Sequence, residues 1–476
     1  MMLLEALPVG RALVLKRRTM KVSKRVLKYA ELNLKEVLHT TLNPEGPGVV
    51  RIHLVPPKIE GNNLEASVAI VNGMDIVPVN VSWTILLAEF IKEVNKYSGR
   101  EITAEETESI LNNACKNVQR VFWPVSKRIL KNDIYRIMKT FTQIAYGEEP
   151  DESVEYINLG DYAPNMTAPH RMDLMVSAMT KDGIWHCNQK CIHCYAAGQE
   201  RAEEVELSTD EWKTIIDICK DAKIPQLTFT GGEPTMREDL TELIRYAGWF
   251  VTRLNTNGIK LTREYCKELY DASLDSVQIT FYSENEEIHN KLVGASQYQN
   301  TVAGIKNAIA AGLNISINTP LCTLNKDYVK TLEFLHNMGI IYVTCSGLIT
   351  TGNALSEDSR NLRLSEEEMK QILTDAVGFC CRNGMEISFT SPGWIEKEFF
   401  DMYGLSMPSC GACLSNMAVT PGGNVVPCQS WLSEETLGNM IGNEWSDIWN
   451  GAKCREHREF SASVFGICPL RRHNED

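Results

Sequence analysis

The sequence has no apolar run near the roughly 18 residues that a membrane-spanning helix needs. It also lacks excess positive charge, because its formal net charge of −13 leaves no basic surface to neutralise nucleic-acid phosphates. The N-terminal segment does not resemble a secretion signal, since Glu5 comes before its basic residues. These absences exclude a membrane protein, argue against a nucleic-acid partner and predict a cytoplasmic protein.

Cysteine, by contrast, is abundant, with 15 residues in 476. In a reducing compartment these thiols are not expected to form disulfides. Eight of them fall into two groups, one at 187–194 and one from residue 410 onward, which is typical of metal binding. The other seven are scattered through helix and strand patterns and are predicted to be buried, inert thiols: Cys115, Cys219, Cys266, Cys322, Cys345, Cys380 and Cys381.

The pattern of apolar and polar residues in the N-terminal third predicts a small separate module. Residues 64–82 alternate apolar and polar residues around Asn72-Gly73, which predicts a hairpin. Three helical patterns follow, at 83–98, 104–119 and 126–144. We therefore expect a winged-helix-like α+β module. The whole chain divides into a basic N-terminal arm (1–63), this module (64–148), an acidic linker (149–171), a core (172–355), a bridging helix and strand (356–408) and a small C-terminal domain (409–476).

The core alternates apolar strands with amphipathic helices six times. Parallel strands need crossover connections, so this pattern predicts an α/β fold, a partial (β/α)6 TIM-like barrel with its helices outside. Chemistry in such barrels sits at the carboxyl ends of the strands. The cysteine loop, "GGEP" at 231–234 and "NTNG" at 255–258 each follow a predicted strand.

Cys187, Cys191 and Cys194 form a C-x3-C-x2-C pattern within eight residues. Structural zinc is one interpretation, with His186 or His193 as the fourth ligand. Three thiolates in one loop suit a cubane iron–sulfur cluster better, because one iron then has no protein ligand. That open iron is a place for a substrate or cofactor to bind.

C-x3-C-x2-C after the first strand, together with "GGEP" after the second, resembles the radical S-adenosylmethionine (SAM) enzymes over about 172–350. The resemblance implies a [4Fe–4S] cluster on Cys187, Cys191 and Cys194 whose open iron chelates SAM. It implies cleavage of SAM to a 5′-deoxyadenosyl radical, with an electron donor such as flavodoxin or ferredoxin. It also implies that SAM is contacted by these residues: Gly231, Gly232, Glu233, His193, Asn255, Thr280 and Asn318.

The C-terminal cysteines are similar to a second family pattern. Cys413, nine residues, Gly423, four residues and Cys428 match the opening of the SPASM extension of peptide maturases. The resemblance implies one auxiliary iron–sulfur cluster, as in the shortened "twitch" variant, held by Cys410, Cys413, Cys428 and Cys468. Cys454 is interpreted as a spare thiol, and four-cysteine zinc is the alternative for this site.

The predicted module at about 64–145 weakly resembles the peptide-recognition element of ribosomal-peptide maturases, including the peptide chaperone of the pyrroloquinoline quinone pathway. Such modules bind a leader peptide as an added strand, and residues 64–82 are expected to carry that edge. The leading hypothesis is therefore a radical SAM enzyme that cross-links, epimerises or oxidises residues of a ribosomal precursor peptide. A radical SAM oxidoreductase acting on a small molecule or haem precursor, and a zinc-stabilised scaffold without activity, are the alternatives.

Overall fold

The computed structural model divides the chain into two compact units, Met1–Met166 and Thr167–Asp476. The residues it describes are 20–42, 50–57, 59–64, 67–72, 75–97, 101–154, 166–390, 395–405, 407–432, 435–464 and 466–471. Among the described helices, none combines the length and apolar composition that a bilayer crossing requires.

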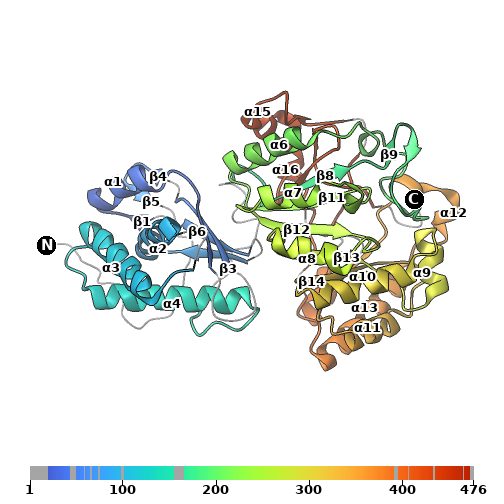
Figure 1. The fold of residues 1–476 in the computed structure, drawn as a ribbon, viewed down its shortest axis with the longest axis horizontal. Coiled ribbons are helices and arrows are strands. Elements are labelled where there is room, and N and C mark those ends of the chain that lie inside the picture. The colour runs from blue at the N-terminus through green and yellow to red at the C-terminus, as the bar shows by residue number, and fades with distance from the viewer. Residues whose placement is uncertain are drawn as a thin grey trace. The chain divides into compact units, whose positions relative to one another are not determined.

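The N-terminal unit is built on a four-stranded antiparallel sheet in the order β2-β3-β6-β7 (Figure 1). The strands are β2 (Leu38–Leu42), β3 (Val50–Val55), β6 (Ser67–Val71) and β7 (Asp75–Val79), and a small sheet joins β1 (Met20–Lys21), β5 (Asn63–Leu64) and β4 (Ile59–Glu60). The helices are α1 (Lys24–Asn33), α2 (Val81–Val94), α3 (Ala104–Val121) and α4 (Lys127–Ala145). Antiparallel pairing of β6 with β7 confirms the predicted hairpin.

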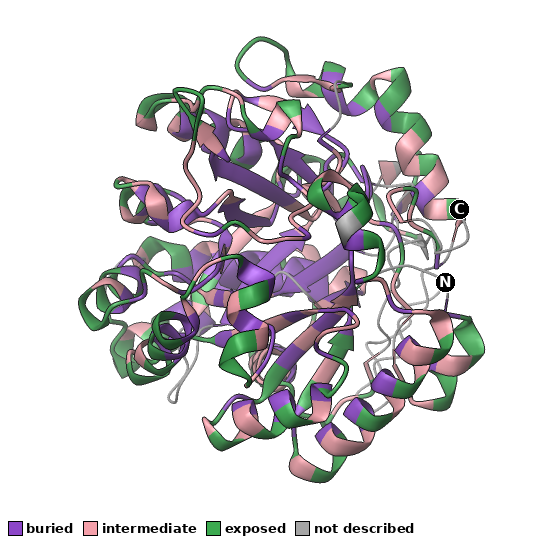
Figure 2. Ribbon diagram, turned by 90° about the vertical axis from the view of Figure 1, so that its right-hand side faces the viewer, coloured by how far each residue is buried: buried purple, intermediate pink, exposed green. Residues whose placement is uncertain are grey.

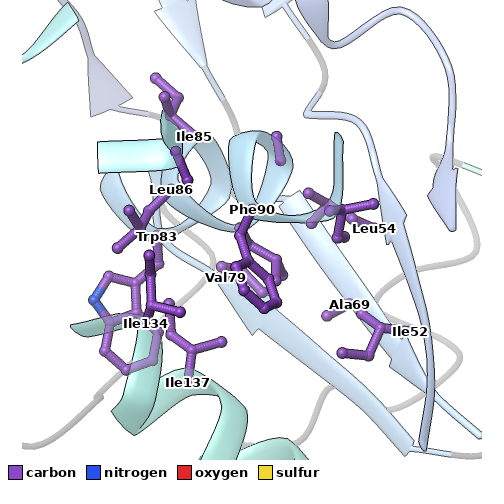
Figure 3. Packing of buried hydrophobic residues seen from close by; sticks show 14 of the residues in the cluster. Ile52, Leu54, Ala69, Val79, Trp83, Ile85, Leu86, Phe90, Ile134 and Ile137 are labelled. Atoms are coloured by element: carbon purple, nitrogen blue, oxygen red, sulfur yellow. The ribbon is translucent and has the colours of Figure 1, made fainter. Parts of the chain in front are cut away.

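Helix α2 lies at the centre of this unit because it is apolar on nearly every side. Trp83, Leu86 and Phe90 point from it toward residues of the sheet and of α4, such as Leu54 and Ile137 (Figure 3). Each such large side chain contributes about 1.5–3 kcal/mol when it is removed from water. The unit therefore has a hydrophobic core of its own.

The predicted arm at 1–63 differs from the structure, which packs the described part of it into this core. Val26 and Ala30 of α1 and Ile52 of β3 are buried in the same cluster as α2. The sequence of β3, Val-Arg-Ile-His-Leu-Val, alternates apolar and polar residues as a strand does, but the structure buries Arg51 and His53 along with their apolar neighbours. Residues 11–19 of the basic stretch lie outside the described residues.

The second unit contains a ten-stranded sheet that confirms the predicted parallel barrel core (Figure 1). Six strands lie side by side in chain order and pair in parallel: β8 (Arg171–Ser177), β11 (Gln226–Gly231), β12 (Val251–Thr256), β13 (Ser276–Thr280), β14 (Ile315–Leu321) and β15 (Tyr342–Gly347). β16 (Glu386–Phe389) adds a seventh parallel strand beyond β15. All carboxyl ends therefore meet at one edge of the sheet.

Amphipathic helices cover one face of this sheet, with their outer sides exposed and the strands between them buried (Figure 2). They are α6 (Thr209–Asp221), α7 (Leu240–Tyr246), α8 (Arg263–Asp271), α10 (Tyr298–Ala310), α11 (Tyr328–Asn337) and α13 (Glu366–Asn383). Three shorter helices follow strands β13, β15 and β16, namely α9 (Glu286–Val293), α12 (Glu357–Arg360) and α14 (Lys397–Met402), and the first two contact the segment at 190–192. Capping boxes begin α6 at Ser208 and α13 at Ser365, as such sequences predict.

The C-terminal segment continues the same sheet on its other side. β17 (Asn416–Val419) pairs in parallel with β8, and β18 (Asn424–Val426) and β19 (Gly438–Asn439) follow antiparallel. Two helices, α15 (Trp445–Asn450) and α16 (Ala452–Ser463), come next. Six of the seven scattered cysteines are buried as predicted, but Cys381 is exposed, because it lies on the outer side of α13.

Candidate functional site

The three-cysteine loop lies where β8 ends, after a short hairpin of β9 (Thr180–Lys181) and β10 (Ile184–Trp185). Backbone hydrogen bonds fix its centre to the end of α9, from Lys190 N to Val293 O (3.0 Å) and from Ile192 N to Leu292 O (3.1 Å). Gly294 allows this approach, since a Cβ there would lie 2.2 Å from Lys190 O. The loop is thus held by backbone contacts on the barrel's carboxyl edge.

The three thiols fit a cationic cofactor. None is in a disulfide, and burial together with the Glu233 charge raises the pKa of Cys187 to about 12. Burial also raises the pKa of Cys191, and the charges of Cys194 and Cys187 raise it further. Thiolates so placed need positive charge, which a bound iron–sulfur cluster supplies. In the described part of the chain, no three His, Cys, Asp or Glu side chains are arranged to hold one metal ion; cubane thiolates bind separate irons and do not need that arrangement.

Apolar clusters flank the loop on two sides and partly shield its three half-buried cysteines from water. Met175 and Met179 belong to a buried cluster that packs against Cys187 and Cys194. A second cluster, which includes Leu292, Val293 and Tyr282, packs against Cys191. A low-potential cluster benefits from such a shell, because solvent exposure is one of the factors that set its potential.

Gly231 and Gly232 have a packing role that the sequence resemblance does not reveal. Gly231 has φ +140° and lies so near β8 that a Cβ would be 2.2 Å from Ser177 O. A Cβ on Gly232 would be 2.9 Å from Ala178 O, and Gly232 N donates to Ser177 O at 2.8 Å. The Cys187 thiol in turn donates to Gly232 O at 3.5 Å. The two glycines therefore bring the end of β11 against both β8 and the cysteine loop.

The Glu233 carboxylate is 1% exposed and joins neighbouring strand ends. It accepts hydrogen bonds from Thr235 (N, 3.1 Å; Oγ1, 2.6 Å), from Thr256 Oγ1 (2.6 Å) and from Asn257 N (2.8 Å). Asn257 Nδ2 then donates to Asn188 Oδ1 in the cysteine loop at 2.6 Å. Burial raises the pKa of Glu233 although these donors oppose the shift. The carboxylate thus connects the ends of β11 and β12 to the cysteine loop. Asn188, which completes this hydrogen-bond network, was not indicated by any sequence pattern.

The remaining predicted SAM contacts lie on the inner face of the sheet or in the loop. Thr280 and Asn318 are paired neighbours on β13 and β14, and Asn318 Oδ1 accepts from Thr344 at 2.9 Å. Asn255 on β12 has a buried Oδ1 with no partner. His193 is buried, its Nδ1 has no partner, and burial lowers its pKa to about 4, which keeps the ring neutral. These unsatisfied polar atoms are what a ligand-binding face presents before its ligand is bound.

Tyr282 is a further residue of this site that sequence reasoning missed. Tyr282 belongs to the apolar cluster against which Cys191 packs, its ring lies 5.1 Å from that of His193, edge to face, and burial together with the charge of Cys191 raises the pKa of its hydroxyl. The Cys191 thiol itself donates to Gln189 Oε1 at 3.7 Å, so the Tyr282 hydroxyl is a candidate donor to the sulfur once a cluster is bound. Hydrogen bonds to cluster sulfurs raise the reduction potential of the cluster.

We expect Tyr282→Phe to lower the potential of the loop cluster by about 40 mV, since a net hydrogen bond is worth about 1 kcal/mol and 1.4 kcal/mol corresponds to 59 mV for one electron. An EPR-monitored redox titration of the reconstituted protein measures this shift, with Tyr265→Phe, on α8, as the control. An unchanged potential in the Tyr282 variant would show that the hydroxyl does not reach the bound sulfur.

The second cysteine group gathers where β17 begins and β18 ends. Cys413 N donates to Pro427 O at 3.1 Å, which sets Cys413 beside the segment that carries Cys428. Burial, and the charges of Cys410 and Cys468, raise the pKa of Cys428 to about 12. Cys413 is within reach of Cys428. The buried Arg471 hydrogen-bonds Cys468 and donates from Nη1 to Leu348 O at 3.1 Å. The four predicted ligands are therefore brought into one region, and as a set of thiols they fit an iron–sulfur cluster.

Cys454, interpreted from sequence as a spare thiol, lies against this group. The Cys413 thiol hydrogen-bonds it, which lowers the pKa of Cys454, and Arg458 Nη1 donates to its Sγ at 3.5 Å. Cys454 is 1% exposed. The region therefore holds five thiols rather than four.

Comparison with known proteins agrees with this geometry. Residues 186–335 match the "Radical SAM superfamily" and residues 410–470 match "Iron-sulfur cluster-binding domain" (SPASM). The chain is 28% identical over 58% of its length to the AdoMet-dependent heme synthase of Oleidesulfovibrio alaskensis (74% of that protein). It is 27% identical over 56% of its length to the PqqA peptide cyclase of Granulibacter bethesdensis (71% of that protein).

The fold is similar to that of Streptococcus suis SuiB, solved bound to precursor peptide SuiA, with TM-score 0.53 and 14% identity over 82% of this chain and 86% of that one. Domains of these two types bind a [4Fe–4S] cluster with SAM and auxiliary iron–sulfur clusters, respectively. Residues 186–335 are therefore a radical SAM domain, and residues 410–470 are a SPASM iron–sulfur domain.

Proposed function

We propose that this protein is an oxidoreductase-type radical SAM enzyme that modifies residues of a ribosomally made precursor peptide. When bound, the cluster and SAM supply the 5′-deoxyadenosyl radical that abstracts a hydrogen atom from the substrate. The carrying observation is the joint presence of the radical SAM and SPASM domains with a separate N-terminal sheet unit. Similarity to a PqqA peptide cyclase supports a peptide substrate.

The chain's own residues would prepare this chemistry. Cys187, Cys191 and Cys194 would hold the SAM-binding cluster, and Cys410, Cys413, Cys428 and Cys468 one auxiliary cluster. Backbone atoms of 231–233 would bind the SAM amino group, while the Glu233 carboxylate fixes the strand ends through Thr256 and Asn257. His193, Asn255, Thr280 and Asn318 would provide the remaining SAM contacts. A flavodoxin or ferredoxin would deliver the electron.

The two edge strands of the N-terminal sheet differ in how well each could pair with a leader peptide bound as an additional strand. Within 64–82, only β7 lies at an edge, but its residues 76–79 are buried and Pro78 has no N–H to donate. The opposite edge strand, β2, is more exposed and has no proline. His39 O accepts from Asn95 Nδ2 (2.8 Å), so His39 and, two residues on, Thr41 direct their backbone groups away from β3. We therefore place the leader peptide on β2 rather than on 64–82.

The test is to co-express the chain with candidate precursor peptides from short reading frames beside its gene and to analyse those peptides by mass spectrometry. In binding titrations with the full chain, Thr41→Pro should weaken leader affinity about tenfold, because it removes a main-chain donor. Thr41→Val keeps that donor and serves as the matched control. An unmodified peptide together with equal affinities for all three proteins would contradict the proposal.

A second candidate is a haem-pathway or other small-molecule reaction, favoured by the similarity to the heme synthase. It needs no leader peptide, so it predicts conversion of a tetrapyrrole by the purified enzyme and no effect of Thr41→Pro.

A further inference from the structure

A row of polar residues crosses the inner face of the barrel sheet, on the side away from the helices. On β12, Leu254 is fully buried beneath the helices, whereas its neighbours Arg253 and Asn255 are half-buried on the opposite face. Parallel partners at one level share a face. The strand register therefore sets these residues in one row: Asp173, Thr228, Arg253 and Ser276.

This row has more positive charge than its one carboxylate balances. Arg171 already binds both oxygens of Asp173, through Nε at 2.8 Å and Nη2 at 3.3 Å. In the described part of the chain, no carboxylate lies within ion-pair distance of the Arg253 guanidinium, and its Nε has no acceptor. Burial and the Arg171 charge lower the pKa of Arg253 to about 10, so it is still protonated at neutral pH.

The neighbours of Arg253 are unsatisfied too. Thr228 is 1% exposed and its Oγ1 has no partner, and the Oδ1 of Asn255 is likewise unpaired. A buried polar atom without a partner has lost its hydrogen bonds to water, which is unfavourable, and a partly buried charge without a counter-ion is more unfavourable still. A set of such groups on one face is explained by a ligand that completes them.

We propose that Arg253 binds a carboxylate of the substrate, with the Thr228 hydroxyl as a second donor. The planar guanidinium fork matches a carboxylate in shape and charge. The carboxylate site is inferred from the structure, whereas the identity of the substrate that carries the carboxylate rests on the proposed function. Arg253 lies three residues before Thr256, about 10 Å below the strand end where the cysteine loop is held. On a peptide, the carboxylate would thus belong to an acidic residue two or three positions from the modified one; on a tetrapyrrole it would be a propionate.

The test is an affinity cycle on the full, anaerobically reconstituted chain with SAM bound. One arm uses the synthetic precursor peptide and versions in which each acid is replaced by its amide. The other uses a propionate-bearing porphyrin and its methyl ester. Each probe is titrated by calorimetry against the wild type, Arg253→Gln, Arg253→Lys and Arg263→Gln, the last being an exposed arginine on α8.

We expect the wild type and Arg263→Gln to prefer one acid over its neutral form by about tenfold or more, and Arg253→Gln to lose that preference. Arg253→Lys should keep part of it. The melting temperature of Arg253→Gln should be unchanged or higher, because an uncompensated charge is removed, whereas a structural arginine would leave it lower.

The outcomes separate the two proposals. Acid-dependent binding confined to the porphyrin keeps the Arg253 site and rejects the peptide substrate. Peptide binding that ignores the acid, or equal preferences in the wild type and Arg253→Gln, rejects the Arg253 site and leaves the peptide substrate intact. Absence of acid-dependent binding to the wild type in both arms also rejects the site.

Discussion

Cys191→Ala should abolish 5′-deoxyadenosine formation. Cys191 is the central thiol of the loop and packs against the apolar cluster that contains Tyr282 and Val293. Cys322 is a buried member of that cluster but is not part of the loop. Loss of a residue that only hydrogen-bonds a metal ligand lowers activity by up to about 100-fold, so loss of a ligand itself should lower activity by more than that. We expect bound iron to fall from about eight to about four atoms per chain, as for one of two cubanes.

Cys428→Ala is the matched comparison, because it removes a thiol from the other group. It should lose the same amount of iron yet retain SAM cleavage, while conversion of the substrate stops. The measurements are iron and sulfide content after anaerobic reconstitution and chromatography of deoxyadenosine. Deoxyadenosine formation by the Cys191 variant at the wild-type rate, or zinc in place of iron in the loop, would contradict the assignment.

The barrel core could be predicted because its signals are local. Each strand is a short apolar run, and capping boxes such as Ser208 with Glu211 mark the helices between them. The cysteine spacing and the position of "GGEP" after a strand then locate the site without knowledge of side-chain geometry. Chain order and spatial order coincide from β8 to β15, so no long-range pairing had to be inferred.

The parts that escaped prediction depend on non-local contacts or on buried polar residues. β17 pairs with β8, almost 250 residues earlier in the chain, and no local signal encodes that choice. β3 lies within the predicted basic arm although its sequence alternates like a strand, and that alternation does not indicate that Arg51 and His53 are buried. The link from Glu233 through Asn257 to Asn188, and the lone charge of Arg253, follow from strand register, which a sequence without its pairing partners does not specify.

Gly231→Ala should have the second large effect, this time on the fold and the SAM edge together. Two independent costs add at this position: φ +140° is a region that L side chains rarely adopt, and the new Cβ would lie 2.2 Å from Ser177 O, a backbone atom that cannot rotate away. Backbone strain costs about 1–3 kcal/mol and overpacking about the same. We therefore expect the free energy of unfolding to fall by about 3–5 kcal/mol.

The structural reason for so large an effect is that Gly231 is where the register of β11 against β8 shifts. Displacement of this strand end would move Gly232 away from Cys187 and Glu233 away from Asn257, and so would disturb the loop that holds the cluster. Thermal melting and SAM affinity should both decline. Gly442→Ala is the control, since a Cβ there has no neighbour within 4 Å and no positive φ to strain. A Gly231 variant that melts and binds SAM like the Gly442 variant would mean that β11 does not approach β8 this closely.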